Sequence, residues 1–134
     1  MASHGKFSRY ENRSRIFEHK WSLVIVDEAH KASKKTNLLN KKIRKLNYEK
    51  ILLLTATPIQ NSLLELYELC DILHPGALAK NASEFAEIFA FDKDARFLRS
   101  SKVQQFKDQI KKSLIRTTRK ESGIQFPSRN VISH

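Results

Sequence analysis

Two short apolar runs constrain the fold of this chain more than any other feature of its 134 residues. Residues 23–26 are Leu-Val-Ile-Val and residues 51–54 are Ile-Leu-Leu-Leu, and each run stops abruptly at polar residues. Unbroken apolar runs of this length are typical of strands that are buried on both faces of a parallel sheet. In such sheets, ligands bind beyond the carboxyl ends of the strands. We therefore predict an α/β fold with two neighbouring parallel strands whose polar residues line one edge.

The segment between the two runs predicts a crossover helix. Its apolar residues recur at helical spacing, with lysines on the other face: Leu38, Leu39, Ile43 and Leu46. A strand, a helix and a parallel strand in this order form the right-handed crossover unit of α/β sheets. Residues 1–20 are polar and basic, and we expect a loop with a short helix there.

Helices are also predicted after the second run. Ser62 and Glu65 have the spacing of a capping box, and the apolar side of the helix that follows them comprises Leu63, Leu66, Leu69, Cys70 and Leu73. Pro75 and Gly76 end this helix. Two further amphipathic helices are expected, the first after an Asn81–Glu84 cap; their apolar residues are Phe85, Ile88, Phe89 and then Val103, Phe106, Ile110, Leu114. We expect residues 1–76 to form an α/β unit and residues 77–134 to form a helical extension.

The residues that follow the first run can carry phosphate chemistry. Asp27 ends the predicted strand, where its carboxylate can hold Mg²⁺, a hard cation that proteins bind through one or two carboxylates, water and substrate phosphates. Glu28 follows at once and can polarise the water that attacks a γ-phosphate. His30 can link this edge to the second strand through a hydrogen bond. The same four residues also suit a strand followed by an acidic helix cap, which is a common arrangement.

The residues that follow the second run favour the chemical explanation. Thr55 and Thr57 supply two hydroxyls around the small Ala56, and Gln60 and Asn61 supply two amides. Hydroxyls and amides at this edge can respond to the state of a γ-phosphate. A turn at the Thr-Pro pair with an asparagine cap explains part of the heptapeptide of residues 55–61, but not all of it.

Together, residues 27–30 and 54–66 closely resemble motifs II and III of the superfamily-two helicases. The form Leu-Thr-Ala-Thr-Pro-Ile-Gln-Asn is similar to the Swi/Snf-related branch, which often has glycine where Ala56 stands. A looser likeness continues in residues 114–129, where Thr117 stands at a position that is often arginine in that branch. The resemblance implies a partial RecA-like sheet of the P-loop NTPase type with flanking helices, followed by a helical C-terminal extension.

The same resemblance implies a function. Members of this branch hydrolyse ATP with Mg²⁺ and use the cycle to move along, or remodel proteins on, double-stranded DNA. By this resemblance Asp27 is the Mg²⁺ ligand and Glu28 is the base that activates water. Both residues belong to the ATP site, together with residues that couple the state of ATP to the grip on DNA: His30, Thr55, Thr57 and Gln60.

One part of a complete ATP site is not found in these 134 residues. A phosphate-binding loop needs the sequence Gly-x-x-x-x-Gly-Lys-Ser/Thr, and the chain has only Gly5, Gly76 and Gly123. We therefore expect the chain to be a piece of the first lobe, to act with the missing lobes of the same ATPase in cis or in trans, and to hydrolyse no ATP alone.

The net charge of the chain favours a polyanionic partner. It is +11 at pH 7, with a pI near 10.0, which suits nucleic acid. Residues 31–45 contain seven basic residues and no acid. We expect five of these lysines to contact the phosphates of double-stranded DNA: Lys34, Lys35, Lys41, Lys42 and Lys45. The alternative is a solvated helix face, which is the usual meaning of a charge run.

Composition excludes several other classes of protein. With 40% hydrophobic and 29% charged residues, and no apolar run near the ~20 residues that span a bilayer, we expect a soluble protein that does not bind membranes. We predict a cytoplasmic, nucleoid-associated location, or a nuclear one in a eukaryote. The single cysteine, Cys70, allows no internal disulfide.

Two rival functions are weaker. A non-catalytic DNA-binding or interaction module would explain the charge but would leave the acidic motif without a role. A nuclease that holds metal with Asp27 and Glu28 would lack the further carboxylates that two-metal chemistry needs.

Overall fold

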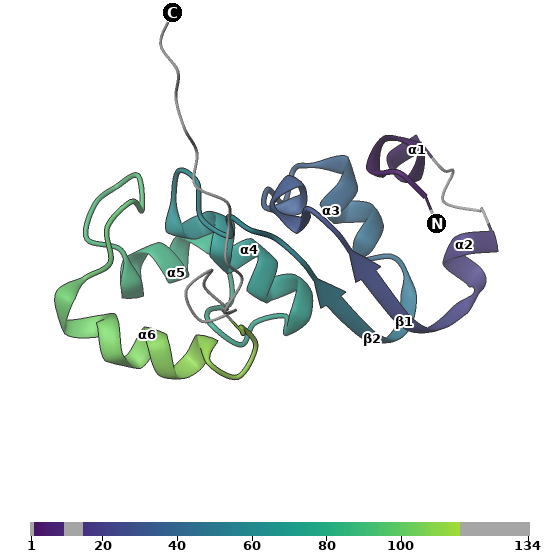
Figure 1. The fold of residues 1–134 in the computed structure, drawn as a ribbon. Coiled ribbons are helices and arrows are strands. Elements are labelled where there is room, and N and C mark those ends of the chain that lie inside the picture. Colours follow the sequence, from purple (N-terminus) through teal and green to yellow (C-terminus); the bar gives the residue numbers. More distant parts are fainter. Residues whose placement is uncertain (1, 10–14, 116–134) are drawn as a thin grey trace, which may run out of the picture.

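A computed structural model describes residues 2–9 and 15–115 of the chain. Figure 1 shows the two strands towards one end of the molecule, helices α5 and α6 towards the other, and helix α4 between them. Two short helices precede the first strand, where we expected one. The elements in chain order are α1 (His4–Arg9), α2 (Arg15–Glu18), β1 (Lys20–Val26), the 3₁₀ helix η1 (Ala29–Ala32), α3 (Leu38–Ile43), β2 (Asn47–Leu53), α4 (Leu63–Leu73), α5 (Ala82–Phe89), the 3₁₀ helix η2 (Ser100–Lys102) and α6 (Val103–Ile110).

The two strands pair in parallel, with Val24 opposite Ile51 and Val26 opposite Leu53. Helix α3 connects them, so the predicted α/β fold with a strand–helix–strand crossover is confirmed. Both strands are longer at their N-terminal ends than the apolar runs, and Lys20 of β1 pairs there with Glu49 of β2 at 2.9 Å. The register places the ends of both apolar runs at the same edge of the sheet.

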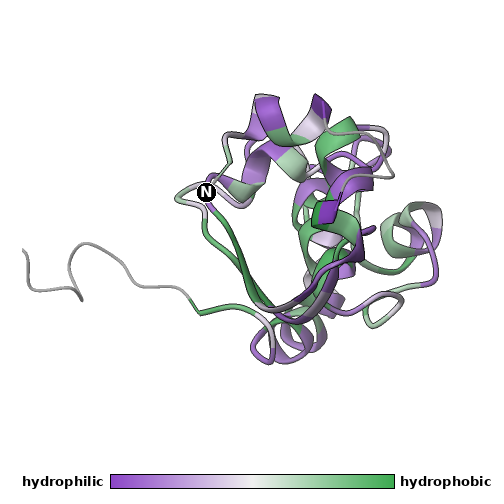
Figure 2. Ribbon diagram, turned by 90° about the vertical axis from the view of Figure 1, so that its right-hand side faces the viewer, coloured by the Kyte–Doolittle hydropathy of each residue, from purple (hydrophilic) through white to green (hydrophobic). Residues whose placement is uncertain are grey.

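The prediction that both faces of the strands are buried is wrong for the described residues. Side chains alternate between the faces of a strand, and one face packs on the helices through Val24, Val26, Ile51 and Leu53. The opposite face carries large apolar side chains that are 43–57% exposed, namely Leu23, Ile25, Leu52 and Leu54 just beyond β2. On the hydropathy scale that colours Figure 2, residues 23–26 of β1 and 51–53 of β2 are hydrophobic, whereas the first residues of both strands are hydrophilic. The described helices therefore cover one side of an apolar sheet.

Helix α4 takes part in two separate cores, and this explains why nearly all of its residues are buried. Its Leu69 and Ile72 belong to a cluster on the buried face of the sheet that also includes Val26, Leu39 and Ile43. Its opposite side packs in a second cluster that contains Leu63, Leu66, Tyr67, Cys70, Phe85, Phe89 and Phe106. The predicted burial of Phe85, Phe89 and Phe106 is confirmed. The boundary that we place at residue 76 stays a prediction.

Local signals start and end the helices. Ser62 is the N-cap of α4, and its Oγ accepts a hydrogen bond from the Leu64 N–H at 3.0 Å. Asn81 caps α5 in the same way, with the Glu84 N–H as donor at 2.9 Å. Beyond α4, Gly76 has φ of +76°, a conformation that glycine adopts without steric cost. No helix in the described part of the chain is long and apolar enough to cross a bilayer.

Candidate functional site

The carboxyl ends of the two strands are interlocked by backbone hydrogen bonds. The Leu54 N–H donates to the Val26 carbonyl, and the Ala29 N–H donates to the Leu54 carbonyl, both at 2.8 Å. These bonds continue the sheet pattern past the last paired residues and tie η1 to the chain that follows β2. The edge predicted from the sequence therefore exists, because the backbone that follows β1 is bonded to the backbone that follows β2.

Glu28 occupies a left-handed backbone conformation, with φ 48° and ψ 45°. For a residue other than glycine this conformation costs on the order of 1 kcal/mol or more, and such strain is concentrated at functional sites. Its N–H donates to Oδ1 of Asp27 at 2.9 Å. The side chain of Glu28 is 52% exposed, and its Oε2 lies 3.2 Å from Nδ1 of His30. The strained turn thus places the Glu28 carboxylate beside the imidazole.

The predicted link from His30 to the second strand is confirmed. Nδ1 of His30 lies 3.3 Å from Oγ1 of Thr55, which comes just after β2. The same nitrogen faces the Glu28 carboxylate, which only accepts hydrogen bonds. The tautomer with a proton on Nδ1 can share this N–H between the carboxylate and the Thr55 hydroxyl. His30 therefore connects the residue proposed as base to the strand that carries the threonines.

Further hydrogen bonds continue from Thr55 to the start of α4. Oγ1 of Thr55 accepts the Thr57 N–H at 3.2 Å, and Oγ1 of Thr57 accepts from Nε2 of Gln60 at 3.1 Å. The Gln60 N–H then donates to Oε2 of Glu65 at 2.6 Å. We call this path the edge chain, and its members are Glu28, His30, Thr55, Thr57, Gln60 and Glu65. All of them except Glu65 were predicted as site residues from the sequence.

Glu65 was assigned only a capping role, and the structure gives it a larger one. Its carboxylate accepts the N–H groups of Gln60 and Asn61 and the side-chain amide of Asn61, rather than closing back on Ser62. Burial acts to raise the pKa of Glu65, but these hydrogen bonds and the nearby Lys34 hold it below the usual 4.5. The ionised carboxylate therefore fixes the end of the threonine segment on α4.

Asp27 has the properties of a magnesium ligand. Its carboxylate is exposed at the sheet edge, where Oδ1 accepts one backbone N–H. Among the described residues no group of three or more histidines, cysteines and carboxylates could hold a metal ion by itself. Mg²⁺ does not need such a group, because it is commonly bound through one or two carboxylates, water and substrate phosphates. The donor set at this edge therefore suits Mg²⁺ bound together with a nucleotide.

The basic segment divides into exposed and buried cations. Lys34, Lys35, Lys41 and Lys45 are exposed, as expected for residues that contact DNA. The prediction that Lys42 lies with them on the solvent face is wrong, because only 8% of Lys42 is exposed and its Nζ lies 5.2 Å from the centre of the Phe17 ring.

The face of α3 explains this correction. Lys42 follows Leu39 by three positions and precedes Ile43, so all three residues share the buried face of the helix. Leu38, which we assigned to the apolar stripe, is 51% exposed. Arg44 is not a free charge either, since its guanidinium pairs with Glu68 and Asp71 of α4. The seven basic residues of segment 31–45 therefore do not form one solvated surface.

Known proteins share the sequence pattern and the fold of this chain. The SNF2-related domain family matches residues 7–134. This chain belongs to that family. An uncharacterized ATP-dependent helicase, YqhH of Bacillus subtilis, is 34% identical over 123 residues, which are 92% of this chain and 21% of that protein. A chromodomain-helicase-DNA-binding protein 1-like of Mus musculus is 41% identical over 64 residues, 48% of this chain and 7% of the relative.

A solved structure shares the fold of this SNF2-related chain. The Sulfolobus solfataricus SWI2/SNF2 ATPase core in complex with double-stranded DNA superposes with a TM-score of 0.69 and 25% identity, over 90% of this chain and 25% of that one. The chain thus spans about a fifth of the Bacillus subtilis helicase and about a quarter of the Sulfolobus solfataricus ATPase core. Residues 116–129, in which we predict most of the tail that leads out of the first lobe, lie outside the described residues.

Proposed function

We propose that this chain is the part of the first lobe of a DNA-dependent ATPase that carries the magnesium ligand and the water-activating base. The observation that carries the proposal is the edge chain, in which Glu28, His30 and Thr55 meet within 3.3 Å at the carboxyl edge of a parallel sheet. Relatives named as an ATP-dependent helicase and chromatin-remodelling ATPases support the reaction. A related ATPase core in complex with double-stranded DNA supports the partner.

Each residue of the edge has a separate task in this proposal. Asp27 would hold Mg²⁺, which would supply positive charge to balance that of the phosphates of ATP. Glu28 accepts the proton of the attacking water, and His30 orients the Glu28 carboxylate through its Nδ1–H. Thr55, Thr57 and Gln60 respond to the phosphate state and pass it to α4 through Glu65.

Double-stranded DNA is the proposed polyanion. The exposed lysines on and around α3 can reach phosphates without breaking any packing of the protein, namely Lys34, Lys35, Lys41 and Lys45. The buried Lys42 cannot do so, and we remove it from the proposed contact set. A polyanionic DNA partner is consistent with a nucleoid-associated or nuclear location, which we also propose.

The exposed apolar face of the sheet is the proposed docking surface for the rest of the same ATPase, in cis or in trans. Parallel sheets occur almost only with both faces covered, and Leu23, Ile25 and Leu52 are about half exposed on this face. Other parts of the lobe, including a phosphate-binding loop, would cover these side chains and complete the ATP site.

The test uses a full-length ATPase that contains this segment. Glu28→Gln should leave ATP binding intact and lower DNA-stimulated hydrolysis by roughly 10²–10⁴-fold, because the amide cannot accept the proton of water. Asp27→Ala should weaken Mg²⁺-dependent ATP binding as well as the rate. The matched control is Glu49→Gln, since the Glu49 carboxylate is also 52% exposed but lies at the far end of the sheet. Normal hydrolysis in the Glu28 and Asp27 variants, with DNA binding retained, would favour the non-catalytic DNA-binding module instead.

A further inference from the structure

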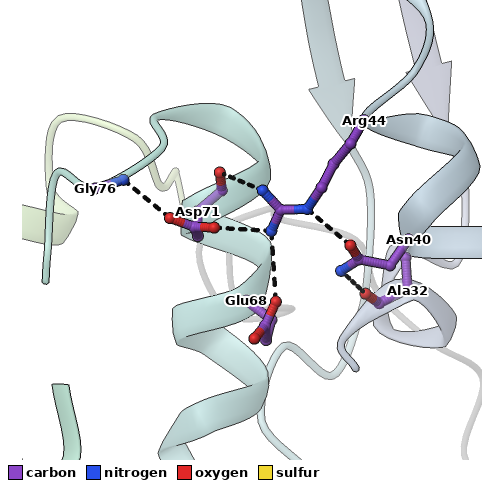
Figure 3. A network of polar contacts seen from close by, with 6 residues as sticks. All are labelled: Ala32, Asn40, Arg44, Glu68, Asp71 and Gly76. Atoms are coloured by element: carbon purple, nitrogen blue, oxygen red, sulfur yellow. Dashed lines mark hydrogen bonds and ion pairs between the residues drawn. The ribbon is translucent and has the colours of Figure 1, made fainter. Parts of the chain in front are cut away.

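Arg44 is the centre of a second polar network, which lies between α3 and α4 (Figure 3). Its Nε donates to Oδ1 of Asn40 at 2.8 Å, and its Nη1 donates to the Asp71 carbonyl at 3.1 Å. Its Nη2 lies 2.9 Å from Oδ2 of Asp71 and 3.4 Å from Oε2 of Glu68. We call these four residues the Arg44 cluster. One guanidinium thus contacts two helices that are more than twenty positions apart in the sequence.

The Arg44 cluster is hydrogen-bonded to the backbone at two places, one in η1 and one in the turn that follows α4. Nδ2 of Asn40, which is fully buried, donates to the Ala32 carbonyl at 2.8 Å, and Ala32 is the last residue of η1. Oδ1 of Asp71 accepts the N–H of Gly76 at 2.9 Å, in the turn that follows α4. The cluster therefore joins the segment that contains His30 to the turn that leads into α5.

The η1 segment is held at both of its ends. At one end the Ala29 N–H is bonded to the sheet edge through Leu54, and at the other end Asn40 holds Ala32. Ala29 and Ala32 are both fully buried, so small side chains seat this short helix against the core. His30 lies between these two anchors. Its ring position is consequently set by the sheet edge and by the Arg44 cluster together.

The chemistry of the cluster indicates a role in orientation rather than in packing alone. Apolar side chains of similar volume usually hold two helices together at least as well as a buried ion pair does. A guanidinium offers five donors in a rigid plane, so it fixes the angle and register of the groups that it contacts. Here that plane meets an amide, a carbonyl and two carboxylates.

We propose that Arg44 is a positioning residue for the catalytic edge. Through Asn40 and Ala32 it holds η1 so that Nδ1 of His30 stays within reach of Glu28 and Thr55. Through Asp71 it ties the same edge to the turn at Gly76. The catalytic meaning of this role rests on the function proposed above, whereas the mechanical link between Arg44 and His30 can be measured without any ATP.

The first experiment is nuclear magnetic resonance on the 134-residue chain, with Arg44→Met and Arg44→Lys. The readouts are the side-chain ¹⁵N shifts of His30 and the amide exchange rate of Gly76. Both variants should shift the Nδ1 signal of His30 and speed exchange at Gly76 at least tenfold more than at amides of the second core. Arg44→Lys should not restore the wild-type signals, because an ammonium group cannot contact Asn40 and Asp71 in the same plane.

Two controls separate positioning from loss of stability. Lys111→Met makes the same change in charge at a side chain that is 73% exposed. Phe106→Leu weakens the second core at a side chain of α6 that belongs to neither the edge chain nor the Arg44 cluster. Neither control should move the His30 signals.

If Arg44→Met does not fold, Asp71→Asn should give the same changes with a smaller magnitude, because asparagine keeps an acceptor for the Gly76 N–H but loses the charge that pairs with Arg44. Unchanged His30 signals in the folded variants, or equal changes in Phe106→Leu, would overturn the proposal.

A second arm in a full-length ATPase distinguishes this proposal from the proposed function. Arg44→Lys should lower the hydrolysis rate about tenfold at saturating ATP while KM for ATP and affinity for DNA stay within twofold. If the His30 signals respond to Arg44 but Glu28→Gln leaves hydrolysis normal, the proposed function fails and the mechanical link stands. If Glu28→Gln abolishes hydrolysis and Arg44→Lys changes neither the spectrum nor the rate, the positioning role fails alone.

Discussion

The edge chain and the Arg44 cluster both start from the η1 segment and both end on α4, but they are built differently. The edge chain runs from His30 to Gln60 through partly exposed side chains at 3.1–3.3 Å, and it ends at the start of α4 on the buried Glu65 carboxylate, which accepts the Gln60 N–H at 2.6 Å. The Arg44 cluster reaches the end of α4 through charged groups, and its carboxylates Glu68 and Asp71 are only 6% and 8% exposed.

This difference indicates which network can change during a reaction cycle. Neutral hydrogen bonds that border on water are replaced by bonds to solvent or ligand at little net cost. Separating a buried ion pair leaves uncompensated charges and costs several kcal/mol. We therefore expect the neutral links of the edge chain, from Thr55 to Gln60, to rearrange when a nucleotide binds, and the Arg44 cluster to persist as the fixed reference.

The largest expected effect on stability is at Arg44. Arg44→Met should lower the free energy of unfolding by about 3 kcal/mol, because Glu68 and Asp71 lose their positive partner inside the protein. Urea denaturation of the 134-residue chain at pH 7 measures this change. Lys111→Met, which removes only an exposed partner of Asp108, should change stability by less than about 0.5 kcal/mol. Similar values for both variants would show that the Arg44 cluster is no stronger than a surface pair.

The edge chain should respond in the opposite way. Replacing Thr55 and Thr57 with alanine removes two weak acceptors and should cost about 1 kcal/mol or less in stability. In a full-length ATPase the same double variant should keep its affinity for DNA but uncouple hydrolysis from movement. Parallel assays of ATP hydrolysis and of translocation measure this loss, with the exposed Thr36→Ala as control. A double variant that moves as far per ATP as the parent would exclude the coupling role.

The cations of α3 and its C-terminal end offer a similar contrast between exposed and buried groups. Each phosphate contact contributes about 0.9 to the slope of log affinity against log salt on duplex DNA. Replacing the exposed Lys41 and Lys45 with glutamine should therefore flatten this slope by about 2 units. Lys42→Gln should leave the slope unchanged, since Lys42 is buried over Phe17. A salt titration of duplex DNA binding measures this slope in each variant. If Lys42→Gln flattened the slope as much as one of the exposed lysines does, the buried position of Lys42 would be contradicted.

The smallest expected effect is on the pH dependence of stability. The pKa of Glu65 in the folded protein lies below 4.5. Its ionised form therefore stabilises the fold at pH values above the unfolded-state pKa, and this stabilisation is lost as pH falls through the folded-state pKa. Burial raises the pKa of Glu68, and the positive charge of Arg44 acts against this shift. The contribution of Glu68 to the free energy of unfolding is therefore lost as pH rises from 4.5 through the folded-state pKa. Urea denaturation between pH 3 and 7 should give slope changes of opposite sign for Glu65→Gln and Glu68→Gln. Slopes of the same sign would contradict the assignment.

The sequence by itself determined the parts of this protein that depend on neighbouring residues. Apolar runs that end in polar residues predicted β1, β2 and their shared edge, because strand formation and strand ends are local properties. Ser62 and Asn81 predicted the starts of α4 and α5, since a cap acts within three residues. The site residues Asp27, Glu28, His30, Thr55, Thr57 and Gln60 followed from the same two segments and from their resemblance to known motifs.

Only the tertiary structure decided which charged residues are internal. Lys42 is buried because α2 brings Phe17 to it, and Arg44 is paired because α4 brings Asp71 to it from 27 positions away. Glu65 turns towards Gln60 and Asn61 because the chain bends back before α4. A charge run in a sequence shows no partner that lies far along the chain. The physical reason is that burial and pairing of a side chain are set by which elements pack together, whereas caps and strand ends are set by the residues beside them.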